Sequence, residues 1–256
     1  MQVNLTGRTA LVTGSTAGIG AATAAALAAA GADVVVNGRN ADTVAEVANR
    51  LGVRGIAADV GTAEGVAEIV ARVPDVDVLV NNAGYFGAMP VFDIPDEEWR
   101  RIYEVNVLSG VRLARHYAPR MVRRGWGRVI FVSSESAIQN PTEMVHYGMT
   151  KTAQLALSRG MAQEVAGTGV TVNSVLPGPT LTEGVREFVQ SLYPDLDFAG
   201  AEKQFMTHNR PTSLLGRLIR PDEVANLITY VASEQSAATT GGALRVDGGV
   251  VTAIIP

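Results

Sequence analysis

The sequence predicts an α/β fold, in which a doubly wound, seven-stranded parallel sheet carries helices on both faces. Short apolar runs with strand character alternate with helical patterns along almost the whole chain. The runs are continuously apolar and rich in valine, which is typical of parallel strands that are covered on both faces. Little linker separates these elements and no boundary divides the chain, so we expect one domain over residues 1–256.

The composition argues against several classes of protein. With 256 residues, 47% of them hydrophobic, the chain can bury a sizeable core. A net charge of −4 argues against nucleic acid or an anionic membrane surface as a partner. The absence of cysteine excludes disulfides and thiolate metal sites, and the scattered histidines give no metal-ligand spacing, so we expect no metal. Neither a signal peptide nor an apolar run of the roughly 20 residues that span a membrane is visible, so we expect a soluble, cytoplasmic protein.

The stretch from Arg8 to Leu27 predicts a strand, a glycine turn and a helix. The apolar run Ala10–Val12 ends at Gly14, Gly18 and Gly20 follow, and the next segment is rich in alanine, the best helix former. Gly14 can adopt the positive φ of a sharp turn, and Gly18 and Gly20 lack a Cβ that would hold a pyrophosphate away from the backbone. The N–H groups at the helix start would face the phosphates. The stretch therefore predicts a nucleotide site.

The remaining elements follow in order along the chain. Apolar, β-branched residues predict the strands. Thr62 is expected to cap a helix, and Pro119 is expected to bend the last turn of a long helix. The further strands are expected at Ala32–Val36, Val53–Ala57, Val76–Val80, Arg128–Ser133, Val170–Val175 and Ala243–Val246. The further helices are expected at Ala41–Leu51, Thr62–Val73, Asp96–Arg123 and Tyr147–Ala166, with another that begins at Pro221.

One long segment, Leu176–Arg220, lacks this alternation. Apolar residues at helical spacing predict short helices within it, and a long insertion in a compact domain is usually functional, so we expect a substrate lid at about residues 180–215. The apolar residues of the lid can contact a substrate or pack the lid onto the body, and the sequence leaves both open. They are Val185, Phe188, Val189, Leu192, Tyr193, Phe198, Phe205 and Met206.

Tyr147 and Lys151 are the strongest candidates for acid–base chemistry. They lie four residues apart at the start of a predicted helix and therefore share one face. A neighbouring ammonium group would lower the tyrosine pKa from about 10, which favours proton transfer to or from an alcohol oxygen. Ser133 and Ser134 end the preceding strand, at the sheet edge where Gly14–Gly20 also lies. Ser134 can hold a substrate carbonyl there, whereas a capping role suits Ser133 better.

These motifs together resemble those of the short-chain dehydrogenase/reductase family, in the compact single-domain branch of the 3-oxoacyl-acyl-carrier-protein reductases. The resemblance covers essentially the whole chain, and the thirteen-residue separation of Ser134 and Tyr147 is that of the family. It implies a Rossmann-type fold and an oxidoreductase that uses a nicotinamide dinucleotide. The motifs are Thr13-Gly14-Ser15-Thr16-Ala17-Gly18-Ile19-Gly20, Asp59-Val60, Asn81-Asn82-Ala83-Gly84, Asn106, Ser134, Tyr147, Lys151, Asn173, Pro177-Gly178 and Asp247-Gly248-Gly249.

The resemblance also implies roles for single residues. Tyr147 would move the proton, Ser134 would orient and polarise the carbonyl, and Lys151 would bind the nicotinamide ribose and lower the pKa of Tyr147. Asn106 would hold a water that links Lys151 to solvent. The implied cofactor-binding residues are Gly14, Ser15, Thr16, Gly18, Ile19, Gly20, Arg39, Asp59, Val60, Asn82, Ala83, Gly84, Tyr147, Lys151, Pro177, Gly178, Thr180 and Thr182. Asp59 would bond the adenine, Asn82, Ala83 and Gly84 would line the adenosine, and Thr180 competes with Thr182 for a place beside the nicotinamide.

The end of the second strand indicates which dinucleotide is bound. Gly38 stands where NAD-dependent relatives commonly carry an aspartate, which bonds the ribose 2′-hydroxyl and repels a 2′-phosphate. Arg39 follows and is free to stack on adenine and to pair with a phosphate. We therefore expect NADP(H) to be preferred, with NAD(H) as the alternative.

The leading functional hypothesis is an NADPH-dependent ketone reductase or alcohol dehydrogenase that acts on a small, apolar carbonyl or alcohol. Substrate identity is expected to depend on Tyr85–Met89, Glu135–Met144 and the lid. His146 could also touch the substrate. The alternatives are a 3-oxoacyl thioester reductase and a non-catalytic dinucleotide-binding sensor. Gly125 and Thr168 stand where the acyl-carrier-protein reductases carry basic residues, which argues against a carrier partner.

Two surface features complete the expectations. A cluster of basic residues is interpreted as a solvated helix end, with cations near a helix C-terminus; it comprises Arg120, Arg123, Arg124 and Arg128. The resemblance implies a homotetramer, and the apolar tail Val250–Pro256 is expected to pack on a partner or on the lid.

Overall fold

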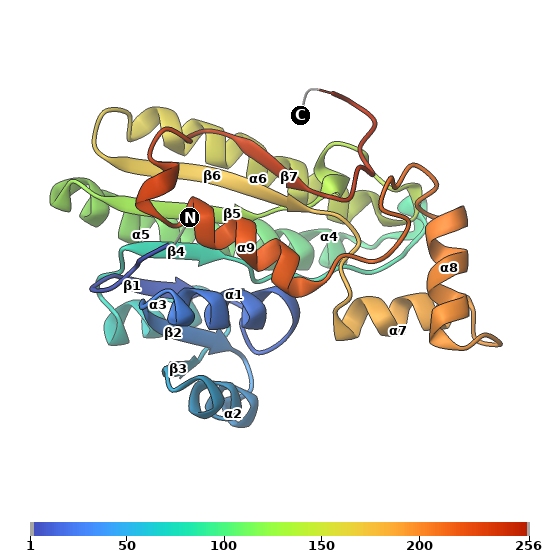
Figure 1. Cartoon of the computed structure of the whole chain (residues 1–256), viewed down its shortest axis with the longest axis horizontal. Helices are drawn as coiled ribbons and strands as arrows, with labels where there is room; N and C mark the ends of the chain where they lie inside the picture. The colour runs from blue at the N-terminus through green and yellow to red at the C-terminus, as the bar shows by residue number, and fades with distance from the viewer. Residues whose placement is uncertain (1–2, 255–256) are drawn as a thin grey trace.

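The seven-stranded parallel sheet is confirmed by the computed structural model, which describes residues 3–254 (Figure 1). The strands are β1 (Thr9–Val12), β2 (Asp33–Gly38), β3 (Arg54–Ala57), β4 (Val78–Asn81), β5 (Gly127–Val132), β6 (Val170–Pro177) and β7 (Ala243–Val246). They pair in parallel in the order β3-β2-β1-β4-β5-β6-β7. The order reverses between β1 and β4, and a crevice outside the carboxyl ends of the strands is expected at such a switch point.

Helices cover both faces of the sheet, as predicted (Figure 1). The alternation of side chains along β1 shows how, because Ala10 and Val12 enter one apolar core and Leu11 enters the other. The first core is closed by α1 (Gly18–Ala29), α2 (Ala41–Leu51) and α9 (Pro221–Val231), and the second by α3 (Ala63–Arg72), α5 (Ser109–Arg124) and α6 (Val145–Glu164). The predicted helix starts at Ala41 and Pro221 are confirmed, and Thr62 caps α3 by accepting from Gly65 N.

The prediction of one continuous helix over Asp96–Arg123 is wrong in the middle of that range. The segment begins as α4 (Asp96–Tyr103), passes through a π-helical turn (Glu104–Leu108) and continues as α5, which contains Pro119. Such turns insert one extra residue into a helix and often occur at functional sites. Here the turn carries Asn106, whose side chain bonds to the loop after β4 and to α6.

The expected helices in the long insertion are α7 (Glu183–Leu192) and α8 (Phe198–His208), which lie beyond the carboxyl end of the sheet (Figure 1). The apolar residues divide between the two roles that the sequence leaves open. Val189 and Met206 are buried in a small core that joins α7 and α8 to Leu218. Val185, Phe188 and Phe205 have both roles, because they pack in or against this core and also line a cavity.

The interpretation of Arg128 as part of a solvated helix end is wrong. It lies in β5 with its side chain 2% exposed, donates to the carbonyls of Ser233 (3.1 Å) and Gly169 (3.2 Å), and its guanidinium lies 4.4 Å from the ring centroid of Trp126. These carbonyls come from segments distant in sequence, and nothing in the local sequence around Arg128 indicates them. By contrast, Arg124 pairs with the exposed Asp75 at the helix end.

The remaining turns of helix are short 3₁₀ segments at Val91–Asp93, Glu135–Ala137, Thr142–Met144 and Glu234–Ser236. In the tail, Val250 and Val251 are buried against the chain itself, where the Val250 carbonyl accepts a hydrogen bond from Thr212 Oγ1 (2.6 Å). Thr252, Ala253 and Ile254 are exposed, Ile254 to 94%, and Ile255 and Pro256 of the expected apolar tail lie outside the described residues. Within residues 3–254, no helix combines the length and the apolar character needed to cross a membrane.

Candidate active site

The glycine turn is held rigidly against the end of β4. Asn82 Nδ2 donates to the carbonyls of Thr13 and Gly14, both at 2.9 Å, and Thr13 Oγ1 accepts from Asn82 N and Ala83 N, both at 3.0 Å. Gly14 has φ +60°, as expected, and a Cβ there would lie 2.9 Å from Ala83 Cα. At Gly20 a Cβ would lie 2.5 Å from Asn82 Nδ2. At Gly14 and Gly20 the neighbouring atoms are therefore so close that only glycine fits.

This turn presents the start of α1 to its surroundings. Ala17 precedes the helix, and its methyl side chain cannot accept a hydrogen bond from the first N–H groups of α1. Unsatisfied N–H groups at a helix start, with the positive end of the helix dipole behind them, form an anion site. The glycine cradle and the helix start together fit the pyrophosphate of a dinucleotide.

Three neighbouring cavities lie along the carboxyl edge of the sheet. The Arg39 cavity has a volume of about 520 Å³, the Gly18 cavity about 270 Å³ and the Tyr147 cavity about 170 Å³. Gly84 lines both the Arg39 and the Gly18 cavities, and Thr182 lines both the Gly18 and the Tyr147 cavities. The three thus form one path that passes the glycine turn, as a dinucleotide requires.

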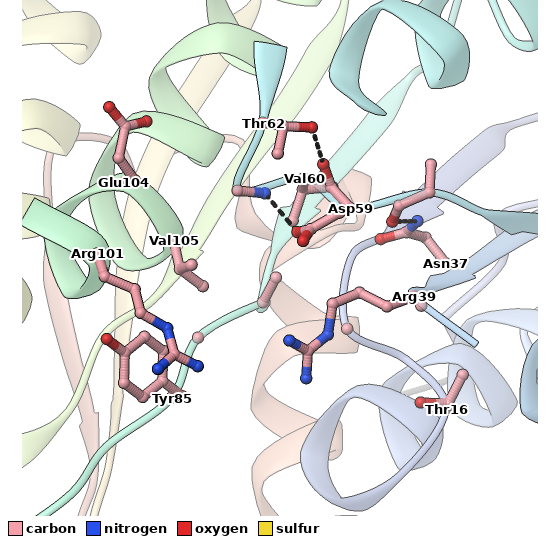
Figure 2. Close-up of a pocket in the computed structure, with 16 residues that line it drawn as sticks. Thr16, Asn37, Arg39, Asp59, Val60, Thr62, Tyr85, Arg101, Glu104 and Val105 are labelled. Carbon is pink, nitrogen blue, oxygen red and sulfur yellow. Dashed lines mark hydrogen bonds between the residues drawn. The ribbon is translucent and has the colours of Figure 1, made fainter. Parts of the chain in front are cut away.

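Of the residues predicted for the adenosine end, Arg39, Asp59, Ala83 and Gly84 line the Arg39 cavity, whereas Asn82 lines the Gly18 cavity. Figure 2 shows Arg39 and Asp59. Asp59 is held in place because its Oδ1 accepts from Gly61 N (2.9 Å) and its carbonyl accepts from Thr62 Oγ1 (3.0 Å). The guanidinium groups of Arg39 and Arg101 face each other across the cavity in Figure 2. Arg39 is exposed and, among residues 3–254, makes no ion pair, which leaves its charge available.

Ser134 and Tyr147 line the Tyr147 cavity, as the sequence predicts. Lys151 Nζ lies 5.5 Å from the centre of the Tyr147 ring and donates to the Val132 carbonyl (2.9 Å). Phe86 packs edge-on against Tyr147, with ring centroids 6.0 Å apart. The convergence of serine, tyrosine and lysine from β5 and α6 is therefore present in the folded chain.

The pKa of Tyr147 differs from the expected lowering. Burial and the neighbouring Glu135 carboxylate raise the pKa of Tyr147, and the hydrogen bond with Ser134 offsets only part of this. Burial also lowers the pKa of Lys151, to about 8. In the chain alone the pKa of Tyr147 is therefore raised, not lowered, and the Lys151 ammonium is turned toward a backbone carbonyl.

Asn106 is locked by its surroundings. Its Oδ1 accepts from Tyr85 N and its Nδ2 donates to Tyr85 O, both at 2.9 Å. The carbonyl of Asn106 accepts from Gln154 Nε2 (2.6 Å), and Gln154 Oε1 lies 3.5 Å from Lys151 Nζ. A side chain that the sequence analysis did not single out thus joins Lys151 to Asn106. Gln154 could have been noticed, since it lies three residues after Lys151 on the same helix face.

The other predicted residues are placed as follows. The Ser15 hydroxyl is buried and donates to Val12 O, so it holds the turn and lines none of these cavities. Ser133 does not act as a cap, because its hydroxyl donates to Lys151 O (2.9 Å). Thr182 caps α7 by accepting from Val185 N. The remaining cavity-lining residues from the predicted set are Thr16, Ile19, Val60, Pro177, Gly178 and Thr180.

Two charged residues at this site carry no signal in the local sequence. Glu135 accepts a hydrogen bond from Ser134 Oγ at 2.5 Å, and Arg210, which follows α8, places Nε 3.7 Å from the other Glu135 oxygen. Both line the Tyr147 cavity. The expectation that His146 could touch the substrate is wrong, because its ring is 1% exposed, packs against Trp99 and does not line that cavity.

Comparisons with known proteins agree with this geometry. A family model described as enoyl-(acyl carrier protein) reductase matches residues 14–251. The uncharacterised oxidoreductase YvaG of Bacillus subtilis is 50% identical, over 99% of this chain and 100% of that protein. The 3-oxoacyl-[acyl-carrier-protein] reductase FabG of Aquifex aeolicus is 31% identical, over 98% of this chain and all of that protein. The structure of L-sorbose reductase from Gluconobacter frateurii, complexed with NADPH and L-sorbose, superimposes with a TM-score of 0.93 at 33% identity, covering 99% of this chain and 100% of that one.

Proposed function

Because the chain belongs to the short-chain dehydrogenase/reductase family of NAD(P)(H)-dependent oxidoreductases that act on CH–OH and C=O groups, we propose that it is an NADPH-dependent ketone reductase and alcohol dehydrogenase. The observation that carries this proposal is that Ser134 and Tyr147 line one cavity beside the glycine turn, with Lys151 Nζ 5.5 Å from the centre of the Tyr147 ring. A bound nicotinamide ring supplies or accepts the hydride. The rest of the chemistry belongs to the residues of this chain.

Tyr147 is the proton donor in the direction of reduction. Its hydroxyl would give a proton to the carbonyl oxygen of the substrate, and the raised pKa of Tyr147 keeps the hydroxyl protonated until then. Ser134 would hold the same oxygen once its single hydroxyl proton turns from Glu135 Oε2 to the carbonyl. Lys151, with a pKa of about 8, stays mostly charged at neutral pH, and its positive charge would stabilise the phenolate as it forms. Gln154 links Lys151 to Asn106 and holds the amine in place.

The preference for NADPH rests on the end of β2. Gly38 offers no carboxylate to repel a 2′-phosphate, and the free Arg39 guanidinium lies in the same cavity as Asp59 (Figure 2). The Gluconobacter sorbose reductase, a similar structure, was solved with NADPH. An arginine that pairs with phosphate contributes a charge-assisted hydrogen bond, which favours NADPH over NADH.

A 3-oxoacyl thioester reductase is the second candidate, favoured by the similarity to the Aquifex enzyme. Reduction of a carrier-bound thioester needs a basic surface for the acidic carrier. Of the arginines near Gly125, Arg124 pairs with Asp75 (2.7 Å) and Arg128 is buried, which leaves the exposed Arg123. This favours a free small-molecule substrate.

We also propose that α7 and α8 act as a lid over the Tyr147 cavity and that the chain forms a homotetramer. Phe188 and Phe205 come from this segment and line the cavity, which supports the first proposal. Phe92 and Leu214 are large apolar side chains that are 98% and 89% exposed, which supports an association of subunits. Light scattering on the eluted protein should give four times the chain mass, and a monomer mass would contradict the tetramer.

The reductase proposal is tested by NADPH consumption with a panel of ketones, diketones, quinones and 3-oxoacyl thioesters. The wild-type chain should reduce at least one of the first three classes. Tyr147→Phe should lower kcat by at least about 100-fold, because it removes the proton donor. It should still bind NADPH with an affinity close to that of the wild type. A Tyr147→Phe variant with full activity, or no turnover by a wild type that binds NADPH tightly, contradicts the proposal.

A further inference from the structure

The residue after Ser134 places a charged group in the cavity where the substrate is expected to bind. Glu135 has a side chain that is only 7% exposed, and it lines the Tyr147 cavity. Its Oε2 accepts the hydrogen bond from Ser134 Oγ (2.5 Å). The proposed mechanism does not need this carboxylate. A buried carboxylate is costly unless it is paired or bonded, so its place beside the reacting group calls for an explanation.

The charges around Glu135 leave no free cation for an acidic ligand. Arg210 has a side chain that is 10% exposed, and it is shared by two carboxylates, with Nε 3.7 Å from Glu135 and Nη1 3.4 Å from Glu143. Lys151, the other cation nearby, is turned toward the Val132 carbonyl. On this side of the cavity one guanidinium is thus shared by two carboxylates, and no cation is left to pair with an added anion. An anionic substituent next to the carbonyl would therefore be repelled.

The carboxylate of Glu135 still has capacity to accept hydrogen bonds. An ionised carboxylate has about four acceptor sites. Ser134 Oγ and the backbone N–H groups of Glu135 and Ser136 donate to the carboxylate, and the nearest cation, Arg210 Nε, lies 3.7 Å from Oε1, beyond hydrogen-bond distance, so about one acceptor site is left. A neutral group that donates a hydrogen bond, such as a hydroxyl, matches this free acceptor.

The position of Glu135 indicates where such a hydroxyl would be attached. Ser134 is proposed to hold the carbonyl oxygen, and the Glu135 oxygen lies within one hydrogen bond of the Ser134 hydroxyl. A donor on the carbon next to the carbonyl carbon would therefore lie close to Glu135. The cavity is also lined by the rings of Phe86, Phe188 and Phe205, which suit an apolar group.

A fourth cavity supports the polar character of this side. The Asn140 cavity, of about 300 Å³, is lined by Gln139, Asn140 and Glu143, and it shares Glu135 and Arg210 with the Tyr147 cavity. The Glu135–Arg210 pair thus separates an apolar cavity from a polar one. A substrate that has one apolar end and one hydroxylated end fits across this boundary.

We propose that Glu135 is a specificity-determining residue, which accepts a hydrogen bond from a hydroxyl group on the carbon next to the reacting carbonyl. The preferred substrates are neutral α-hydroxy ketones with an apolar remainder, and vicinal diols in the direction of oxidation. The hydroxyl is recognised and is not changed by the reaction. This inference rests on the proposed function of the site as a ketone reductase.

Three ketones that share one apolar group test the proposal. They are 2-hydroxyacetophenone, propiophenone, which carries a methyl in place of the hydroxyl, and phenylglyoxylate, which carries a carboxylate. For the wild type, kcat/KM with NADPH should be about 10- to 100-fold higher for the hydroxy ketone than for propiophenone, as expected of a hydrogen bond to a charged group. Phenylglyoxylate should be the poorest substrate.

Variants of the two acidic residues assign the preference to Glu135. Glu135→Leu should reduce the ratio of kcat/KM between hydroxy ketone and propiophenone to about one, and Glu135→Gln, which keeps an acceptor, should give an intermediate ratio. Glu143→Gln is the matched control: it removes the other acidic partner of Arg210 and should keep the wild-type ratio. Thermal unfolding and NADPH titration show whether each variant is folded.

The outcomes separate this inference from the proposed function. If the wild type reduces propiophenone and the hydroxy ketone equally well, or if Glu135→Leu keeps the preference, the assignment of Glu135 is wrong while the reductase stands. Should the wild type reduce none of the three ketones, nor any ketone of the panel, the proposed function fails and the inference fails with it. The wild-type comparison decides the matter even if a variant does not fold.

Discussion

A Gly20→Ala substitution adds one methyl group where the glycine turn meets α1. Helix propensity alone predicts that the change stabilises the chain by about 1 kcal/mol, because Gly20 lies within the helix. The structure predicts the opposite. The new Cβ would lie against the carbonyl oxygen of Gly14, 2.5 Å from Asn82 Nδ2 and 2.9 Å from Ser15 Cα. Backbone atoms cannot move aside as a flexible side chain can.

The size of the effect follows from these contacts. Overpacking a tight interior site costs about 1–3 kcal/mol, which exceeds the gain from propensity, so the free energy of unfolding should fall by about 1–2 kcal/mol. Relief of the clash requires the Gly14 carbonyl or Asn82 to move, and Asn82 holds the turn through two hydrogen bonds of 2.9 Å. The dissociation constant for NADPH should therefore rise at least about tenfold, which corresponds to about 1.4 kcal/mol.

Gly160→Ala is the matched control. Gly160 also lies within a helix, α6, but it is exposed and a Cβ there has no neighbour within 4 Å. This variant should gain about 0.5–1 kcal/mol and bind NADPH like the wild type. Urea unfolding and a fluorescence titration with NADPH measure both quantities. If Gly20→Ala is as stable as Gly160→Ala and binds NADPH normally, the close packing of the turn is refuted.

Three further predictions concern single charged residues. Arg39→Ala should weaken NADPH binding by about 10-fold or more and NADH binding by less than about twofold; an unchanged ratio in fluorescence titrations would exclude a contact with the 2′-phosphate. The pKa of Lys151 is lowered from 10.5 to about 8, so between these pH values the unfolded chain binds more protons than the folded chain. The free energy of unfolding of the wild type should therefore increase with rising pH relative to that of Lys151→Met, by up to about 1.4 kcal/mol per pH unit, and urea titrations measure this difference. A constant difference between the two proteins would show that Lys151 is not buried in this way. Arg128→Leu should lower the free energy of unfolding by about 2 kcal/mol or more, because the carbonyls of Ser233 and Gly169 lose their donor, and a loss below about 0.5 kcal/mol would show that water replaces it.

Most of the sheet and the location of the site could be predicted because both follow from local patterns. Continuous apolar runs mark buried parallel strands, and the carboxyl ends of such strands share one edge. Gly14, Ser134 and Tyr147 therefore converge whatever the details of the loops. The same reasoning gave the start of α2 at Ala41 and of α9 at Pro221, where cap and proline positions are local signals.

The parts that could not be predicted depend on contacts between distant segments. The contact between Glu135 and Arg210 joins β5 to the end of α8, and neither residue has a periodic signal that points to the other. In the sequence Arg128 looks like the nearby exposed arginines, and only the folded chain shows the carbonyls to which it donates. The pKa of Tyr147 depends on burial and on the Glu135 charge, which outweigh the lysine one turn away. The π-helical turn at Glu104–Leu108 likewise carries Asn106, whose hydrogen bond to Thr150 joins it to a segment more than 40 residues away.

The transfer of hydrogen from the cofactor to the carbonyl carbon is the most direct test of the proposed reaction. The wild type would be incubated with a ketone from the panel and NADPH that carries deuterium at C4 of the nicotinamide, in separate reactions for the two C4 stereoisomers. The product alcohol would then be analysed by mass spectrometry. With one of the two isomers, the product should carry a single deuterium on the carbinol carbon, and Tyr147→Phe should form little of it. Product without deuterium from either isomer would contradict a reductase built on Ser134, Tyr147 and Lys151.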